Sequence, residues 1–297
     1  MFSTNSKIKR IYRAPKDSIY SHRFFSNLAS GYSFTLGKKG ENQDFFSFEP
    51  DGCQVKKYIK GGQYYYSSYE IEQIVSRIAY SLMAYGRAYL YIHPEYSVKQ
   101  EDDGAKTQVL SSFEIGEIVG VIKRKTKEGY LFLRMGYNSE VREIPMTKNQ
   151  LVIFDLKELG FSKKYFLGVM KKLSKCDITA KSTEMIANNS IFYDFTYHVE
   201  KKKYAELKAI RKIGLSFETD KLSDSYIMYK KIQEDELKIR FLEYIVKRIN
   251  EGLHNFLGDN AGELIAHIDR KDYKKLWNDY TEGMITGTEL TKVLFRS

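Results

Sequence analysis

The chain has 297 residues, of which 42% are hydrophobic and 29% are charged. This balance excludes a protein that is disordered throughout, and the length suits two compact domains or one large domain with extensions. The formal net charge is +10, which favours a polyanionic partner, nucleic acid first. Because Cys53 and Cys176 have no spacing typical of a disulfide framework or a zinc site, and no run is apolar over the length of a membrane span, we expect a protein of a reducing cytoplasm with no membrane partner.

A basic arm and short strands or irregular structure are expected in residues 1–66. Within residues 1–40, eight Lys and Arg stand against a single acidic residue, Asp17. Such an arm is typical of contact with nucleic-acid phosphates, and a solvated tail is the alternative reading. The candidate nucleic-acid-binding residues of the arm are Lys7, Lys9, Arg10, Arg13 and Lys16.

A small α+β domain is predicted for residues 67–160. A helix from Ser67 to about Tyr85 has apolar residues at three- and four-residue steps, and Gly86 is its stop. The sequence "RAYLYIH" then alternates like a strand, and because both of its faces are fairly apolar we expect cover on both sides. Two apolar segments that bracket "TKEG" predict a hairpin, and "LVIFDL" predicts a further strand.

Long helices are predicted for residues 161–262. The pattern from Asp177 to about Ile213 indicates one long helix or two shorter ones. The segment "SFETDKLSDSYIMYKK", residues 216–231, breaks this pattern, and a third helix runs through about Leu257 with Gly258 as its stop. A seven-residue repeat on the first helical stretch marks a candidate subunit interface, formed by Ile178, Met185, Phe192 and Val199 with Phe195 beside them.

Two short helices are predicted for residues 263–297, the second starting at a capping box of Thr286 and Glu289. The fold class is therefore α+β. A mixed domain of a helix and an antiparallel sheet is followed by long helices and a helical C-terminal region.

Two patterns imitate catalytic or metal chemistry. The sequence "NDYTEGMITGTE", residues 278–289, has the glycine and the final glutamate of a calcium loop, but a helix stop and a capping box explain the same letters. Glu143, Asp155 and Lys157 have the acid and lysine arrangement of a metal-dependent nuclease, and an ordinary strand end with solvated charges is the alternative. We expect no catalytic residue, no cofactor site and no metal site.

The order of elements over residues 67–200 resembles the portal proteins of tailed bacteriophages. In that family an apolar helix leads into a glycine and an aromatic strand, here "AYSLMAYGRAYLYI". A hairpin sheet ends in a strand at the place of "LVIFDL", and a helix start such as "LGVMKKL" precedes a long helix. The ending "EGMITGTELTKVLF" is similar to a turn near the C-termini of many portals.

This resemblance implies a closed ring of about twelve subunits at one capsid vertex, with double-stranded DNA passing through the centre. Residues 67–160 would form the wing, the helix from Asp177 the stem, and the segment near 214–232 the clip. The implied partners are the capsid, the terminase and head–tail adaptor proteins. The implied location is the virion, after assembly in a bacterial cytoplasm.

Two other functions stay open on the sequence alone. One is a nucleic-acid-binding accessory protein of a mobile element, which would use the arm and the lysines Lys201, Lys202 and Lys203 without forming a ring. The other is the metal-dependent nuclease.

Overall fold

The computed structural model describes residues 45–56, 67–92, 110–113, 118–126, 129–135, 141–146, 148–175, 195–214, 223–268 and 270–295. The basic arm lies outside these residues, as do Ile178, Met185 and Phe192 of the predicted interface. The chain divides into two compact units. The described parts of Phe46–Glu158 and Tyr244–Ile265 form the first, and those of Leu159–Glu243 and Ala266–Ser297 form the second. The boundary therefore falls inside the helix α6 (Asp224–Leu257).

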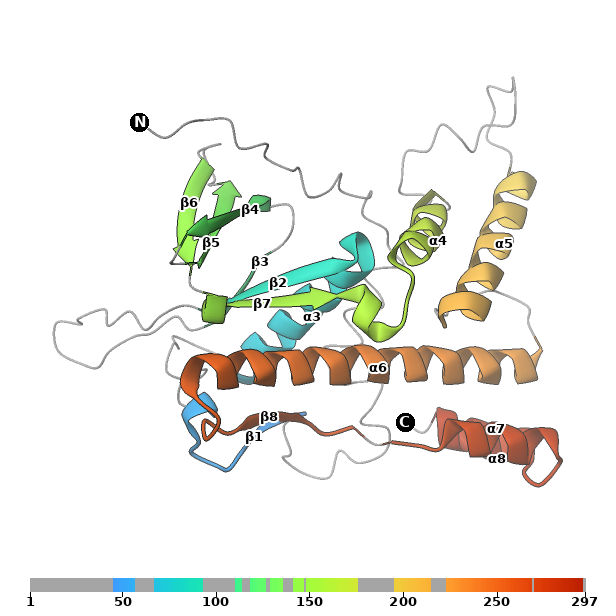
Figure 1. Cartoon of the computed structure of the whole chain (residues 1–297). Helices are drawn as coiled ribbons and strands as arrows, with labels where there is room; N and C mark the ends of the chain where they lie inside the picture. Colours follow the sequence, from blue (N-terminus) through green and yellow to red (C-terminus); the bar gives the residue numbers. More distant parts are fainter. Residues whose placement is uncertain are drawn as a thin grey trace, which may run out of the picture. The chain divides into compact units, whose positions relative to one another are not determined.

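In the first unit, helix α3 (Ser67–Tyr85) packs against strands β2 (Arg87–Ile92), β3 (Leu110–Phe113) and β7 (Leu151–Asp155). The predicted apolar stripe is buried, with Ile71, Ile78 and Leu82 at most 1% exposed. Gly86 has a φ of 72°, which suits a residue without a Cβ, and its N–H donates to the carbonyl oxygen of Leu82 at 2.8 Å. The helix, its stop and the strand that follows are confirmed (Figure 1).

The three strands form an antiparallel sheet in the order β3-β2-β7. Leu90 pairs with Val152 and Ala88 with Phe154, and all four side chains are buried. Tyr89 points to the opposite face because side chains alternate along a strand, and it is 5% exposed. The prediction that β2 is covered on both faces is confirmed at this residue.

The second part of α6 covers β7. A Cβ on Gly252 would lie 2.2 Å from Cγ2 of Val152, so the glycine permits a close approach of helix and strand. The Tyr244 ring stands edge-on to that of Phe154, with 6.2 Å between the centroids. The predicted helix end is confirmed, since Gly258 has a φ of 100° and its N–H donates to the His254 carbonyl oxygen at 2.8 Å.

A second three-stranded sheet has the order β4-β5-β6. Strands β4 (Ile118–Thr126) and β5 (Gly129–Met135) form the predicted hairpin. Strand β6 (Val141–Met146) is a strand that the sequence analysis did not predict between the hairpin and "LVIFDL". Pro145 weakens the strand pattern, but β6 is an edge strand, where a residue without an N–H is tolerated. A second correction is that "FEIGEIVGVIKRK" is no single strand, because Phe113 ends β3 and Ile118 begins β4 in the other sheet.

Strand β1 (Phe46–Glu49) pairs with β8 (Glu263–Ala266). The sequence analysis expected helices alone after residue 263, and a strand of four residues is too short to show a period. Asn250 of α6 fixes β8, since its amide donates to the Leu264 carbonyl oxygen and accepts from the Leu264 N–H, both at 2.9 Å. Short 3₁₀ turns, Lys148–Gln150 and Leu156–Leu159, flank β7.

In the second unit, helices α4 (Lys163–Lys175) and α5 (Phe195–Ile213) pack together. Phe166 of α4 contacts Phe161 and Phe241, with 5.4 to 6.4 Å between its ring centroid and theirs. The break that the sequence analysis placed over residues 216–231 is too long, because α6 begins at Asp224. The first part of α6, residues 224–243, shows no single apolar stripe. It contacts one pair of helices, α4 and α5, on one side and a second pair near the C-terminus on another.

Helices α7 (Tyr273–Thr281) and α8 (Gly287–Leu294) pack on the first part of α6 (Figure 1). A buried cluster joins the three helices and consists of Met228, Ile232, Tyr273, Leu290 and Leu294. The predicted capping box is confirmed, with the Thr286 N–H donating to Glu289 Oε2 at 2.7 Å. Residues 278–289, whose sequence imitates a calcium loop, therefore form a helix end, a turn and a capping box. The α+β class is confirmed.

Candidate functional site

The nuclease-like residues are held in structural contacts. The Arg87 Nε lies 2.7 Å from Asp155 Oδ2, and the backbone N–H of Lys157 donates to Asp155 Oδ1 at 3.1 Å. Glu143 belongs to β6, in the other sheet. Within the described stretches, no three His, Cys, Asp or Glu side chains come together in a way that could hold a metal ion.

Tyr244 binds the same strand end from α6. Its hydroxyl accepts from the Asp155 N–H at 2.8 Å and lies 3.0 Å from Glu158 Oε2 and 3.2 Å from the Asp155 carbonyl oxygen. Burial raises the pKa of the Tyr244 phenol well above its ordinary value, so this hydroxyl stays protonated and can donate. The arrangement anchors β7 to α6 and supplies no free base.

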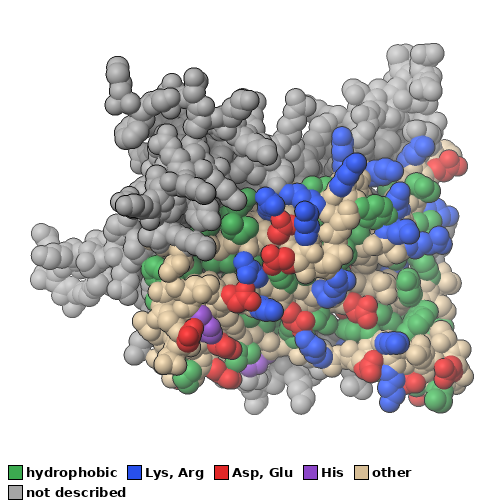
Figure 2. Space-filling model, viewed as in Figure 1, with side chains coloured by type: hydrophobic (Ala, Val, Ile, Leu, Met, Phe, Trp, Pro, Cys, Tyr) green, Lys and Arg blue, Asp and Glu red, His purple; other side chains and the backbone are tan. Residues whose placement is uncertain are grey.

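Helices α4 and α5 are strongly basic. Together they contain eleven Lys and Arg residues and two glutamates, Glu200 and Glu206. Glu206 is buried, and its Oε1 lies 3.9 Å from the Lys202 Nζ. Figure 2 shows Lys and Arg side chains gathered over these helices. We call the exposed residues of the two helices the basic face: Lys164, Tyr165, Gly168, Lys171, Lys172, Thr196, Val199, Glu200, Lys201, Lys203, Tyr204, Arg211 and Lys212.

Packing of α4 against α5 forces the cations outward. On α5 the buried stripe is Ala205, Ala209, Ile210 and Ile213, so the opposite side of the helix faces solvent. The Lys208 Nζ lies 5.9 Å from the centroid of the Tyr165 ring, a cation–π distance that joins the two helices at the surface. The basic face is therefore one surface made by two helices.

The turn between α7 and α8 has the opposite charge. Residues 276–291 contain Asp279, Glu282 and Glu289 and no Lys or Arg. Met284 is 70% exposed, and its backbone N–H donates to the Asp279 carbonyl oxygen at 2.7 Å. Hydrogen bonds from the backbone and side chain of Thr286 lower the pKa of Glu289, which keeps this carboxylate ionised. We call residues 279–289 the acidic turn.

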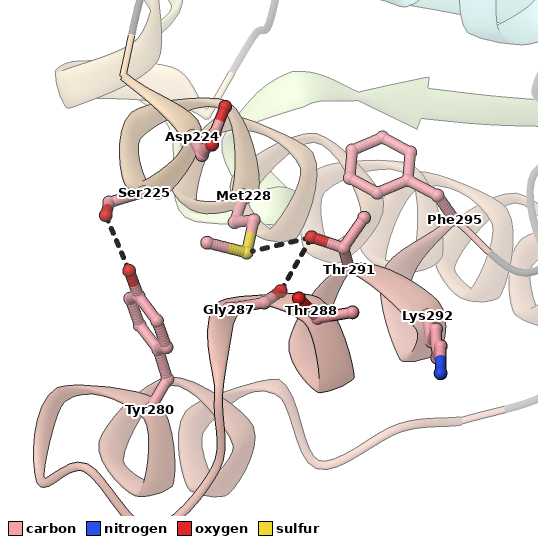
Figure 3. A pocket seen from close by; sticks show the side chains of 9 residues that line it. All are labelled: Asp224, Ser225, Met228, Tyr280, Gly287, Thr288, Thr291, Lys292 and Phe295. Carbon is pink, nitrogen blue, oxygen red and sulfur yellow. Dashed lines mark hydrogen bonds between the residues drawn. The ribbon is translucent and has the colours of Figure 1, made fainter.

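A pocket of about 820 Å³ adjoins the acidic turn. Figure 3 shows its walls, which come from the first turns of α6, from Tyr280 at the end of α7, and from α8 with Phe295. The Tyr280 hydroxyl lies 2.6 Å from Ser225 Oγ. Met228 and Phe295 give the pocket an apolar part, and Asp224 and Lys292 give it charged groups.

Among the residues that the structure describes, exposed large apolar side chains occur on the basic face, in the acidic turn, at the pocket and in the first turn of α6. Tyr165, Val199 and Tyr204 belong to the basic face. The other three lie in the first turn of α6, in the acidic turn and after α8, and they are Ile227, Met284 and Phe295. Charge and exposed apolar area therefore coincide, which is typical of protein interaction sites.

The structure tests only part of the residues that the sequence analysis selected. Lys201 and Lys203 are exposed on α5, and Val199, from the predicted interface, is 43% exposed beside them. Phe195 begins α5, and its side chain is outside the description. The sequence analysis missed the α4 lysines and the pocket. The run "KKYFLGVMKKLSK", which has no acidic residue, was the available signal for α4.

The comparisons with known proteins concern the fold. One chain from the neck of an empty gene transfer agent (GTA) particle, computed with C6 symmetry, aligns with 93% of this chain and 89% of its own at a TM-score of 0.50 and 10% identity. This chain shares the fold of a particle-neck protein. At the level of the fold, this finding agrees with the resemblance to head–tail connector proteins that the sequence shows.

Two further neck and virion structures are similar at lower scores. A chain from the neck of a native GTA particle, computed with C12 symmetry, covers 94% of this chain and 90% of its own, with a TM-score of 0.43 and 11% identity. A chain from the virion of a native GTA particle covers 93% and 89%, with a TM-score of 0.44 and 9% identity.

No protein-family model matches the chain, and no curated protein matches it. Among the helices in the described part of the chain, none has both the length and the apolar character that crossing a membrane requires.

Proposed function

We propose that this chain is a ring-forming structural subunit of a phage-like particle, a portal-type protein of the neck through which DNA is packaged and ejected. The observation that carries this proposal is the shared fold with a chain of a GTA particle neck, which extends over 93% of this chain. A likeness of that extent includes both compact units, so it concerns the whole arrangement of the chain and not a common small motif.

A ring role agrees with the surface of the second unit. The basic face and the acidic turn each expose apolar side chains, as surfaces that become covered in an assembly do. The stripe of Ile178, Met185, Phe192, Phe195 and Val199 is part of the proposal as a subunit interface. Such a subunit acts through assembly and shape and needs no catalytic residue.

The mass of the full chain in solution tests the ring. Light scattering after size exclusion, together with negatively stained images, should show a closed ring of many copies of a 34.7 kDa subunit. A chain that stays monomeric at every concentration, and with capsid proteins added, would show that it acts without a ring. A nucleic-acid-binding accessory protein would then be the better reading.

We further propose that the basic arm contacts the DNA that passes through the ring. Removing residues 1–16 deletes Lys7, Lys9, Arg10, Arg13 and Lys16. If these side chains bind phosphates, the slope of log affinity against log salt should become shallower by about 0.9 for each phosphate of double-stranded DNA that the shortened chain no longer neutralises. An unchanged slope would show that the arm does not bind DNA.

A further inference from the structure

The two charged surfaces of the second unit lie on different sides of α6. The α7–α8 pair packs on Met228 and Ile232. The α4–α5 pair meets α6 elsewhere, with Phe166 against Phe241 and with Gly214 so close to Gln233 that a Cβ would lie 2.9 Å from its carbonyl oxygen. Figure 1 shows the first part of α6 between the two helix pairs.

This placement suits contact between copies of the chain. Two different patches on one subunit, each complementary to the other, make a head-to-tail contact, and such contacts generate rings when the rotation closes. We propose that the basic face of one copy docks on the acidic turn and the adjoining pocket of a second copy, with Tyr204 entering the pocket. This inference rests on the proposed ring and names the surfaces that build it.

Complementary charge is the first argument. The acidic turn presents Asp279 and Glu282 with no Lys or Arg from residue 276 to residue 291, and at the adjoining pocket the Asp224 carboxylate is accompanied by one cation, Lys292. Lys164 and Lys203 are exposed cations on the two helices of the basic face. Matched potentials of this kind fix the orientation of two partners and exclude wrong ones.

Complementary shape is the second argument. Tyr204 belongs to the basic face and is 63% exposed, so most of its ring is available for contact with a partner. The pocket offers the apolar side chains of Met228 and Phe295 for its ring and the Asp224 carboxylate for its hydroxyl. Buried tyrosines in pockets are frequent centres of binding energy. Met284, 70% exposed in the acidic turn, is a second apolar contact that a DNA backbone would leave uncovered.

A charge-reversal pair tests the contact with the full chain. The first variant, Lys164→Glu/Lys203→Glu, places two carboxylates on the basic face, and the second, Asp279→Lys/Glu282→Lys, places two ammonium groups on the acidic turn. Each variant alone should associate roughly a hundredfold more weakly than the unmodified chain, because like charges then face each other. Mixed together, the two variants should associate again, because each surface of one is then opposite in charge to its counterpart on the other.

Two controls separate this effect from general damage. Lys157→Glu/Lys247→Glu changes two exposed lysines of the first unit by the same total charge and should leave association unchanged. Tyr204→Ala should weaken association by roughly tenfold or more. Tyr204→Phe keeps the aromatic side chain and should retain most of the affinity between copies. Circular dichroism checks that every variant is folded.

The readouts are native mass spectrometry and sedimentation, which detect a pair of copies as well as a ring. If both reversed variants form rings normally, the proposed contact is wrong and the proposed function is unaffected. The same holds if each variant fails to associate and mixing the two does not restore association. A reversed basic face that changes only the salt slope of DNA binding assigns that face to DNA and overturns the contact. If the unmodified chain forms no ring but the two variants bind each other, the contact stands and the ring falls. If neither the unmodified chain nor the mixture of variants associates, both the proposed contact and the proposed ring are wrong.

Discussion

The two parts of α6 are buried in different ways. In residues 244–257 the buried positions are apolar, and Ile245, Ile249 and Leu253 have no exposed area. In residues 224–243 the buried positions include charged side chains, with Asp235 at 0% and Lys238 at 2% exposure. One continuous helix thus uses hydrophobic packing in the first unit and paired charges in the second.

The charged part is balanced by local partners. Lys231 Nζ lies 2.5 and 2.7 Å from the two carboxylate oxygens of Asp235, and the Tyr273 hydroxyl lies 3.3 Å from Oδ2. Lys238 Nζ lies 2.6 Å from Glu234 Oε1. Burial nevertheless raises the pKa of Asp235 above its ordinary value, against the attraction of Lys231. Removing one partner of such a buried pair is strongly destabilising, whereas replacing both partners with well-packed apolar residues is often neutral or stabilising.

The largest effect is expected where a buried charge loses its partner. Asp235→Ala should lower the free energy of unfolding by ~3–5 kcal/mol, because the ammonium group of Lys231 remains partly buried without a carboxylate. The double variant Lys231→Met/Asp235→Leu removes both charges and should be about as stable as the unmodified chain, or more stable. Urea unfolding measures both, and a single variant as stable as the double one would show that the pair is not coupled.

The apolar part should respond to lost volume. Leu253→Ala deletes a fully buried side chain and should cost ~2–5 kcal/mol, depending on how far the neighbours collapse into the cavity. Asn255→Ala, two residues away and exposed, is the matched control and should change stability little. Hydrogen exchange of the amides of residues 244–257 locates the destabilised segment, and equal effects of the two variants would contradict apolar packing as its cause.

Added volume gives a smaller effect in the same part of the helix. Gly252→Ala places a Cβ 2.2 Å from Val152 Cγ2 and should destabilise the chain by ~1–3 kcal/mol despite the better helix propensity of alanine. Gly168→Ala in α4, where a Cβ meets nothing within 4 Å, should instead stabilise by up to ~1 kcal/mol. Thermal unfolding of the two variants should therefore shift in opposite directions, and shifts of one sign would count against the close approach of α6 and β7.

The smallest effect concerns α8, which packs on the charged part of α6. Thr286→Ala removes the side-chain acceptor of the Glu289 N–H and should cost ~1 kcal/mol near neutral pH. Thr286 holds the pKa of Glu289 below its ordinary 4.5, so the stability from this contact is present above that pH and is lost as the pH falls through the lower folded pKa. The difference between Thr286→Ala and the unmodified chain should therefore shrink in acid, with Thr288→Ala as the control. A difference that stays constant with pH would contradict the role of the carboxylate.

The contrast within α6 also explains how far the sequence could be read. The apolar part was predicted as a helix that runs through about Leu257, because hydrophobic periodicity reports apolar burial, here of Ile245, Ile249 and Leu253. Residues 224–231, the start of the charged part, were instead interpreted as belonging to a break. Whether a charge is buried depends on partners brought by tertiary structure, here Tyr273 of α7.

The candidate surfaces were predictable to a similar extent. Lys201, Lys202 and Lys203 are adjacent in sequence, so the positive part of α5 was found. The lysines of α4 join it only because the two helices pack side by side. The pocket combines residues of α6, α7 and α8, and no local pattern reports that convergence.

The pairing of β1 with β8 has a consequence for synthesis. Phe46–Glu49 leaves the ribosome long before Glu263–Ala266, and the Val55 N–H must likewise wait for the Ala261 carbonyl oxygen, its acceptor at 2.9 Å. A nascent chain therefore carries the edge of β1 that pairs with β8 through most of its translation before β8 exists, and such an edge is open to strands of other chains. Leu159–Glu243 emerges in the interval, so most of the second unit can fold before the first can close. Because of this order of translation, slow synthesis or a chaperone that shields β1 would aid correct folding.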